Sequence, residues 1–268
     1  MRAVIRNRTA FAGLIITTAV FLAVTIGAAL SPYSATDMDF LNLLAPPSLA
    51  HPFGTDSFGR DVLTRVLFGG RVSLVDSIAG VSLAGFFGAA VGLASAWYGG
   101  FVDTMLMRSS DLVFSFPSFV LALFLMVVLG ASVVTVSAAI ALVYLPIFAR
   151  LTRNLALIVK EEPFVQAARL MGQSTTRILF AEILPNITGP IAVEVTIRLG
   201  YAIFTSATLS FLALGIQQPS PDWGLTISIG RAYLQIAPWE VLFPAAALAT
   251  LIVGVNLMAD GLRQVLEE

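Results

Sequence analysis

Residues 73–97 read SLVDSIAGVSLAGFFGAAVGLASAW, and Asp76 is the one charged residue among them. A helix needs about 20 apolar residues to cross the hydrocarbon core of a bilayer. A segment in lipid must also pair its backbone polar groups internally, which a helix does. This stretch therefore predicts a membrane-spanning helix and, with it, an all-α fold.

Five further stretches have the same apolar character, and they lie at about residues 10–30, 105–130, 132–150, 187–214 and 241–260. Of the whole chain, 57% is hydrophobic and 12% is charged, about half the charged fraction of a typical soluble domain. The sequence therefore predicts a polytopic membrane protein with about six transmembrane helices. The first stretch could instead be a cleaved secretory signal, but it is long for one and five spans follow it, so we expect a retained anchor.

The composition excludes several kinds of site. The chain has no cysteine, one histidine (His51) and a net charge of −1. These counts exclude a disulfide, a thiolate or multi-histidine metal site and a cysteine nucleophile, so we expect neither metal nor cofactor on this chain. The near-neutral charge gives no indication of a nucleic-acid partner.

The basic residues indicate how the chain is oriented. With the N-terminus inside, the cytoplasmic segments hold Arg2, Arg6, Arg8, Arg108, Arg150, Arg153, Lys160, Arg169, Arg177 and Arg263, and the outer segments hold Arg60, Arg65, Arg71 and Arg231. Cytoplasmic loops are enriched in Lys and Arg. This distribution predicts that both termini lie in the cytoplasm, together with residues 160–185.

Residues 160–185, KEEPFVQAARLMGQSTTRILFAEILP, combine charges of both signs with apolar residues. Pro163 suits the first position of a helix, and the preceding glutamates suit its positive end. Gly172 suits the position where this helix stops. Ser174 can cap a second short helix, which we expect to end at Pro185.

The first of these short helices has an apolar stripe at three- and four-residue spacing, made of Phe164, Ala167, Ala168 and Met171. We expect that the chain has no domain of its own to cover this stripe. Two partners are then possible: a groove on another protein, or the lipid headgroups, on which amphipathic helices can lie. The spacing alone favours neither.

The same segment resembles the signature loop of ABC importer permeases, which reads Glu-Ala-Ala, three residues, Gly, nine residues, Ile, any residue, Leu, Pro. Here Gln166-Ala167-Ala168 is followed at the same spacing by Gly172 and by Glu182-Ile183-Leu184-Pro185. Gln166 replaces the glutamate and Glu182 replaces the first isoleucine. The resemblance extends to five further stretches, typical of permeases for dipeptides, oligopeptides and nickel, at residues 51–74, 97–118, 209–224, 237–247 and 256–268.

This resemblance implies a type I ABC importer permease fold in a prokaryotic plasma (inner) membrane. The implied partners are a homologous second permease, ABC ATPase subunits that bind ATP and Mg, and an extracellular or periplasmic substrate-binding protein. Consistent with this, the chain has no phosphate-binding loop of the Gly-x-x-x-x-Gly-Lys-Ser/Thr type. The residues implied in ATPase coupling are Glu161, Glu162, Phe164, Gln166, Ala167, Ala168, Arg169, Leu170, Met171, Gly172 and Pro185.

We divide the chain into residues 1–72, an N-terminal transmembrane helix with an external segment, and residues 73–268, a permease core of five transmembrane helices. Before residue 73 the spacing predicts a short amphipathic helix against the outer membrane face. Asp61 and Arg65 are spaced for an ion pair within it. We expect His51 to be an exposed loop residue.

Two groups of residues are candidates for contact with substrate or with the binding protein. Glu194 and Arg198 lie one helical turn apart within a span, where they can neutralise each other. They face either the second permease or the translocation path, for which the candidates are Glu194, Arg198, Ser206 and Ser210. The stiff loop 215–240 offers Trp223, Arg231 and Trp239 as binding-protein contacts. Pro117 and Pro146 are expected to kink their spans.

The function predicted is that of a permease for di- or oligopeptides. A nickel (chelate) permease is the main alternative, although the absence of cysteine and of intramembrane histidine makes peptides the better candidate. A self-contained secondary transporter is another, with Asp76, Asp111, Glu194 and Arg198 as a relay. A membrane-embedded enzyme would need a base, and no span contains a histidine.

Overall fold

The computed structural model describes residues 7–267, so Arg2 and Arg6 of the predicted cytoplasmic set lie outside the described residues. Between these limits the regular structure is helical, with one isolated β-bridge between Thr55 and Asp61. The helices are α2 (Arg8–Leu22), α3 (Ala28–Leu30), α4 (Val62–Tyr98), α5 (Gly100–Phe114), α6 (Ser118–Leu129), α7 (Val133–Lys160), α8 (Pro163–Leu170), α9 (Thr175–Arg177), α10 (Leu184–Phe211), α11 (Trp223–Gly230) and α12 (Trp239–Glu267).

The structure agrees with the predicted six spans only if α5 and α6 together form one span. Five helical segments are long and apolar enough to cross a membrane, and there are six if α5 and α6 count as one bent span. The two helices meet at 84° around Pro117, because proline cannot donate the backbone hydrogen bond that would continue α5. The prediction of a single kinked span at 105–130 therefore understated the break, whereas α7 continues through Pro146.

Small residues bring α4 and α7 close together, and this pair forms the centre of the bundle. Gly80, Gly88 and Gly92 recur along α4 toward α7. A Cβ atom at Gly88 would lie 2.5 Å from Phe148 Cβ. Small residues at such spacing let helix backbones approach in lipid, where van der Waals packing drives helix association.

The segment that precedes α4 differs from expectation. The helix begins at Val62, and Asp61 caps it by accepting a hydrogen bond from Thr64 N at 2.7 Å. The amphipathic residues before position 73 are therefore the first turns of a 37-residue helix, and the expected boundary after residue 72 falls inside it. Between residues 31 and 61, all of which the structure describes, no separate helix precedes α4.

Two side-chain predictions near this helix start were wrong. Arg65 forms its ion pair with Asp56, at 3.3 Å, and not with Asp61. His51 Nδ1 lies 3.0 Å from Asp61 Oδ1, and its side chain is 16% exposed, so it is largely enclosed by the folded external segment.

Pro185 does not end a helix. Ser174 caps α9 as predicted, with Arg177 N donating to its hydroxyl at 3.4 Å. The chain then continues through a π-helical turn, Ile178–Ile183, directly into α10. Pro185 fits because it lies in the first turn of α10, where helical N–H groups need no partner within the helix.

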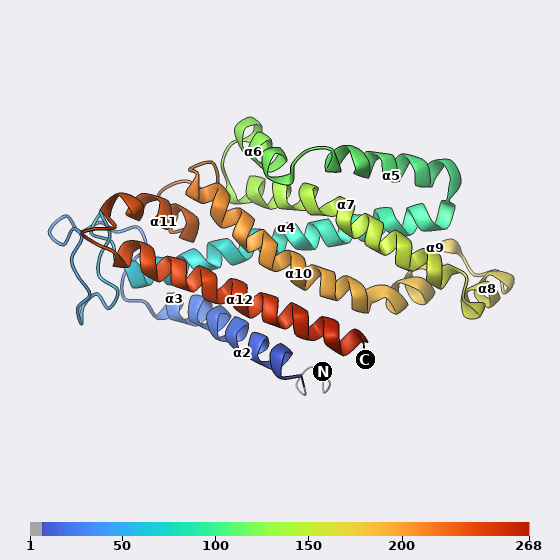
Figure 1. Cartoon of the computed structure of the whole chain (residues 1–268), viewed down its shortest axis with the longest axis horizontal. Coiled ribbons are helices and arrows are strands. Elements are labelled where there is room, and N and C mark those ends of the chain that lie inside the picture. Colours follow the sequence, from blue (N-terminus) through green and yellow to red (C-terminus); the bar gives the residue numbers. More distant parts are fainter. Residues whose placement is uncertain (1–6, 268) are drawn as a thin grey trace.

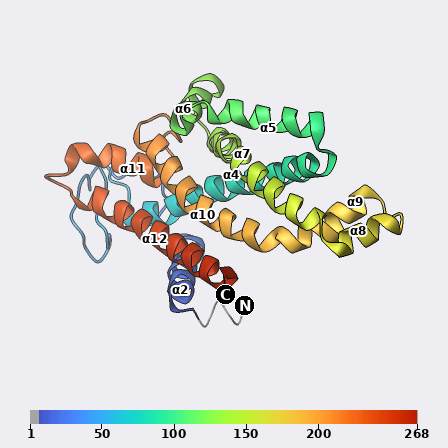
Figure 2. The same cartoon turned by 45° about the vertical axis from the view of Figure 1, so that its right-hand side comes forward.

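The bundle has two distinct ends (Figure 1). One end presents α8 and α9, and the opposite end presents α11 and the loops of residues 31–61. The start of α2 and the end of α12 lie near each other and away from α11, a placement that the rotated view repeats (Figure 2), and Asn7 Nδ2 donates to Gln264 Oε1 at 2.8 Å. We refer to the two ends as the α8 end and the α11 end.

Candidate functional site

The N-terminus of α8 is held by local backbone and side-chain bonds. Glu162 is its N-cap and Pro163 occupies the first turn. Gln166 Nε2 donates to the carbonyl oxygen of Glu161 at 3.0 Å. The glutamine that replaces the signature glutamate therefore stabilises the approach to the helix.

The C-terminus of α8 has the two hydrogen bonds of a Schellman motif. Gly172 N donates to Arg169 O at 3.0 Å, and Gln173 N donates to Ala168 O at 3.2 Å. Gly172 has φ +72°, a conformation that residues with a Cβ atom adopt at a cost. The glycine of the signature is therefore required by the turn that ends this helix, as the sequence predicted.

One face of α8 packs on the rest of the chain. Val165 and Ala168 are buried in a cluster with Leu93, Ala156 and Ile178. Of the predicted stripe the chain covers only Ala168, so the assignment of Ala168 to a docking surface was wrong, whereas Phe164, Ala167 and Met171 stay exposed as expected. The packing fixes α8 rigidly to α4, α7 and the π-helical turn before α10.

The opposite face of α8 is open. Leu170 is 90% exposed, Met171 70% and Phe164 42%, and Gln166 and Ala167 are exposed beside them. Exposed apolar side chains gathered on a short, rigid helix are typical of a protein-binding surface.

Basic residues at the base of α8 are used internally. The Arg169 guanidinium carbon lies 4.4 Å from the ring centroid of Trp97. Lys160 Nζ donates to Ala96 O at 2.8 Å and to Trp97 O at 3.0 Å, satisfying carbonyls near the C-terminus of α4. Arg169, predicted as a coupling residue, therefore also anchors α8 to α4.

Two ion pairs join α5 to α7. Arg153 Nε lies 2.5 Å from Asp103 Oδ1, and Arg150 pairs with Asp111. Asp103 also accepts a hydrogen bond from Ser95 of α4. These aspartates therefore have basic partners, which removes Asp111 from a relay of free carboxylates.

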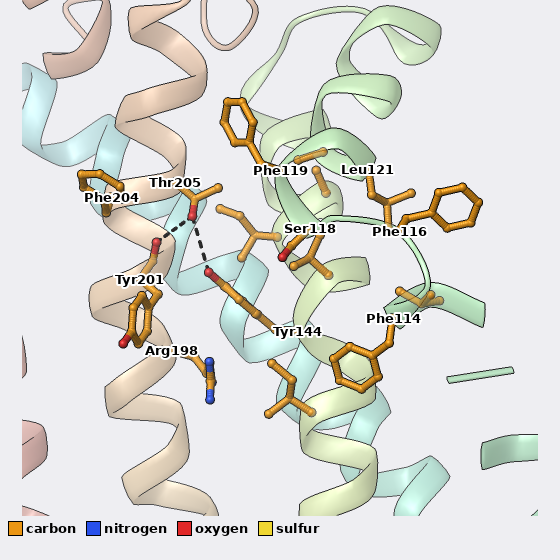
Figure 3. A pocket seen from close by; sticks show the side chains of 16 residues that line it. Phe114, Phe116, Ser118, Phe119, Leu121, Tyr144, Arg198, Tyr201, Phe204 and Thr205 are labelled. Carbon is orange, nitrogen blue, oxygen red and sulfur yellow. Dashed lines mark hydrogen bonds between the residues drawn. The ribbon is translucent and has the colours of Figure 1, made fainter. Parts of the chain in front are cut away.

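A cavity of about 480 Å³ lies among α5, α6, α7 and α10 (Figure 3). Its walls are mainly aromatic and aliphatic, and among the residues that the structure describes Arg198 is the one charged residue that lines it. The lining residues are Val113, Phe114, Phe116, Ser118, Phe119, Leu121, Ala122, Ala139, Ile140, Val143, Tyr144, Ile147, Arg198, Tyr201, Phe204 and Thr205.

Of the predicted path residues, the structure brings only Arg198 to this cavity, with Glu194 next to it. Arg198 Nε donates to Glu194 Oε1 at 2.6 Å, which is the predicted pair. Ser206 is fully buried and bonds Asp76 of α4 at 2.5 Å. Ser210 is also fully buried and accepts from Ile216 N at 3.2 Å. Neither serine lines the cavity.

Sequence reasoning missed four polar cavity residues, Ser118, Tyr144, Tyr201 and Thr205. Tyr144 and Thr205 place their hydroxyl oxygens 3.5 Å apart across the space between α7 and α10 (Figure 3). Tyr201 and Thr205 follow Arg198 at helical spacing, so that spacing could have revealed them. No sequence pattern connects Tyr144 to this face, because it comes from another helix.

The three candidate binding-protein contacts differ in exposure. Trp223 is fully buried and donates its indole N–H to Val66 O at 2.8 Å, so the expectation that it meets a partner was wrong. Trp239 is half-buried and donates to Thr55 O at 3.0 Å. Arg231 is exposed. Next to Trp223, burial raises the pKa of the Asp222 carboxyl, which caps α11 through Leu225 N at 2.9 Å.

The bundle of long apolar helices, with one short helix half-exposed at its end, has the architecture that the resemblance to permeases implies. The chain belongs to the family of binding-protein-dependent transport system inner membrane components, whose family model matches residues 62–268. A second model, described as the N-terminal TM domain of oligopeptide transport permease C, matches residues 1–47. The chain is therefore a multi-pass permease subunit of an ABC importer, and the self-contained carrier and the membrane-embedded enzyme are ruled out.

Curated relatives support this membership along almost the whole chain. The dipeptide transport system permease protein DppC of Alkalihalophilus pseudofirmus is 40% identical, over 98% of this chain and 86% of the relative. A putative peptide transport system permease of Brucella abortus is 40% identical over 99% of this chain and 90% of the relative. The glutathione transport system permease protein GsiD of Escherichia coli is 40% identical over 89% and 79%.

A solved structure shows the same fold. An inward-facing form of the MetNI methionine ABC transporter matches with a TM-score of 0.53 and 19% identity, over 71% of this chain and 93% of that chain. This likeness confirms the predicted permease fold.

Proposed function

We propose that the chain is one permease subunit of an ATP-driven importer for short peptides, and that α8 couples it to a partner ATPase. The observation that supports coupling best is the division of α8 into two faces. Val165 and Ala168 attach it to the bundle, while Phe164, Leu170 and Met171 stay exposed. A rigid helix with such an outer face can transmit the movement of a partner to α4 and α7.

The proposed partners follow from membership in the family. A binding-protein-dependent permease works with a substrate-binding protein and ATPase subunits, and a homologous second permease would complete the path. With α8 on the cytoplasmic side, the start of α2 and the end of α12 would also face the cytoplasm, since they lie away from the α11 end (Figure 1), and we place both termini there. The α11 end, with Arg231 and Trp239, would then face the binding protein.

The substrate class is inferred from the relatives and from the cavity. The relatives above are named for dipeptides, peptides and glutathione, which favours a peptide over nickel. The aromatic walls of the cavity also suit an organic substrate better than a hydrated cation.

Reconstitution tests the proposal. The chain would be assembled in proteoliposomes with its homologous permease, ATPase and binding protein, and uptake of a radiolabelled dipeptide would be followed. We expect uptake that requires both ATP and the binding protein. Uptake of nickel but not of dipeptides would contradict the substrate class, and peptide uptake without ATP would contradict the coupling.

A further inference from the structure

We propose that the terminal nitrogens of Arg198 bind the C-terminal carboxylate of the transported peptide inside the cavity. The inference rests on the proposed function, because it names the part of the peptide that this permease contacts. It starts from the arrangement of Arg198 relative to Glu194 and to the cavity (Figure 3).

The guanidinium of Arg198 is only partly occupied. A guanidinium has five N–H donors, and Arg198 uses Nε for Glu194 Oε1 at 2.6 Å. Within residues 7–267, neither Nη1 nor Nη2 of Arg198 makes a hydrogen bond to the protein. Arg198 lines the cavity and Glu194 does not. The N–H donors of Arg198 that Glu194 leaves unused are therefore available to a ligand in the cavity.

Two tyrosines hold the guanidinium in place. Its central carbon lies 5.9 Å from the ring centroid of Tyr144 and 5.6 Å from that of Tyr201. Such cation–π contacts are stronger when the cation is removed from water. Because Glu194, Tyr144 and Tyr201 fix the group, its remaining donors are pre-organised before a ligand arrives.

A carboxylate fits these donors better than other anionic or neutral groups of a peptide. The planar guanidinium matches the two oxygens of a carboxylate and can bind both at once. Every unmodified peptide ends in a carboxylate, whatever its side chains, so such a contact would serve a permease that accepts many sequences. The Tyr144 and Thr205 hydroxyls can bond the adjacent peptide group.

Glu194 explains how such a site can release its ligand. An unpaired arginine within a membrane is costly, and Glu194 neutralises Arg198 when the cavity is empty. A permanent ion pair also competes with the incoming carboxylate. Binding is therefore weak, as transport requires, because a substrate in a path must leave as well as enter.

The test uses a photoreactive dipeptide, alanyl-p-benzoylphenylalanine, and its C-terminal amide. Each is added to the assembled importer in nanodiscs without the binding protein, so that the binding protein's own preference for one of the two compounds does not affect the labelling. After irradiation, mass spectrometry of the permease measures labelling of residues 113–122, 139–147 and 198–205. We expect the free acid to label these segments at least about tenfold more than the amide, because a charge-assisted hydrogen bond is lost.

The variant is the double substitution Arg198→Gln with Glu194→Gln, which leaves no unpaired charge in the span. We expect it to reduce labelling by the free acid about tenfold and to leave labelling by the amide unchanged. Arg8→Gln, which removes an exposed arginine at the start of α2, is the matched control. Because the double variant could fail to assemble, Arg198→Lys, which keeps the charge but not the planar fork, is tested with it, and both are checked by size-exclusion chromatography.

Each outcome separates this inference from the proposed function. Equal labelling by acid and amide in the wild-type importer, or an unchanged acid preference in an assembled variant, would overturn the inference while ATP-driven dipeptide uptake still supported the function. An anionic lipid that co-purifies with the wild type, is absent from the variants and blocks labelling would also overturn it. Absence of dipeptide uptake in proteoliposomes would overturn both.

Discussion

Arg60 donates a hydrogen bond from Nε to Oδ2 of Asp56 over 2.7 Å, and both side chains are 1% exposed. Arg65 Nε lies 3.3 Å from the same oxygen. One carboxylate thus neutralises two buried arginines at the α11 end. Nearby, Ser57 donates to Glu240 of α12 at 3.2 Å, so this charged cluster joins the external segment to the start of the last helix.

Asp56→Asn should therefore destabilise the protein strongly. Removing one partner of a buried ion pair costs about 3–5 kcal/mol, because the remaining charge has no compensation. A thermal unfolding assay in detergent would show this as a large fall in Tm. Asp37→Asn, at an exposed position in the same external segment, is the control and should change Tm little. An equal Tm for wild type and Asp56→Asn would contradict the role given to the cluster.

Gly88→Ala should weaken the packing of α4 on α7. The added Cβ would lie 2.5 Å from Phe148 Cβ and 2.7 Å from the Leu145 carbonyl oxygen, and overpacking of this kind costs about 1–3 kcal/mol. Gly85→Ala is the matched control, since its Cβ would lie 3.7 Å from Val195, at ordinary contact distance. The two alanine variants should differ in Tm, and similar values would argue against tight packing at Gly88.

Gly172→Val should uncouple the permease while leaving it in the membrane. Valine at φ +72° stores about 1–3 kcal/mol of backbone strain, which would unwind the end of α8. Peptide-stimulated ATPase activity of the reconstituted importer should fall to background. Gly130→Val introduces a similar strain, at φ +83°, between α6 and α7. If both variants lost ATPase activity equally, the defect would reflect general strain and not coupling.

Leu170→Ser should separate stability from coupling. The side chain is 90% exposed, so its loss should change the free energy of unfolding by no more than about 0.5 kcal/mol. Its burial against a partner would contribute about 1.5–3 kcal/mol, so affinity for the ATPase should fall by at least about tenfold. Leu49→Ser, at a fully exposed position in the external segment, should leave both unchanged. Unaltered ATPase affinity in Leu170→Ser would exclude this residue from the interface.

Much of the fold was predictable because membrane insertion leaves a strong pattern in sequence. The apolar stretches gave the spans, and Gly172 and Ser174 marked the helix end and cap at the α8 end that the structure shows. The bend at Pro117 was foreseen only as a kink, since its size depends on how α6 packs against α7.

The errors came from contacts that depend on distant parts of the chain. Ala168 and Phe164 share one helical stripe. The π-helical turn before α10 packs against Ala168 and buries it, whereas Phe164 stays exposed. Trp223 lies in a stretch rich in proline and glycine that was expected to be an exposed loop, yet it begins helix α11, and Val66 accepts its indole N–H inside the bundle. Arg65 pairs with Asp56 and not with Asp61, because the Asp61 carboxylate caps α4. Spacing along one segment does not predict a partner that comes from a distant part of the chain.

The most direct measurement of the central claim is a cysteine crosslink between α8 and the ATPase. The chain has no cysteine, so Leu170→Cys introduces a single thiol on the exposed face, and Leu49→Cys provides the matching control at the other end. With a short linker that carries a maleimide for the thiol and a photoreactive group for the neighbouring protein, the assembled importer containing Leu170→Cys should give a covalent permease–ATPase product, and Leu49→Cys should give none. A product from Leu49→Cys alone would contradict the account.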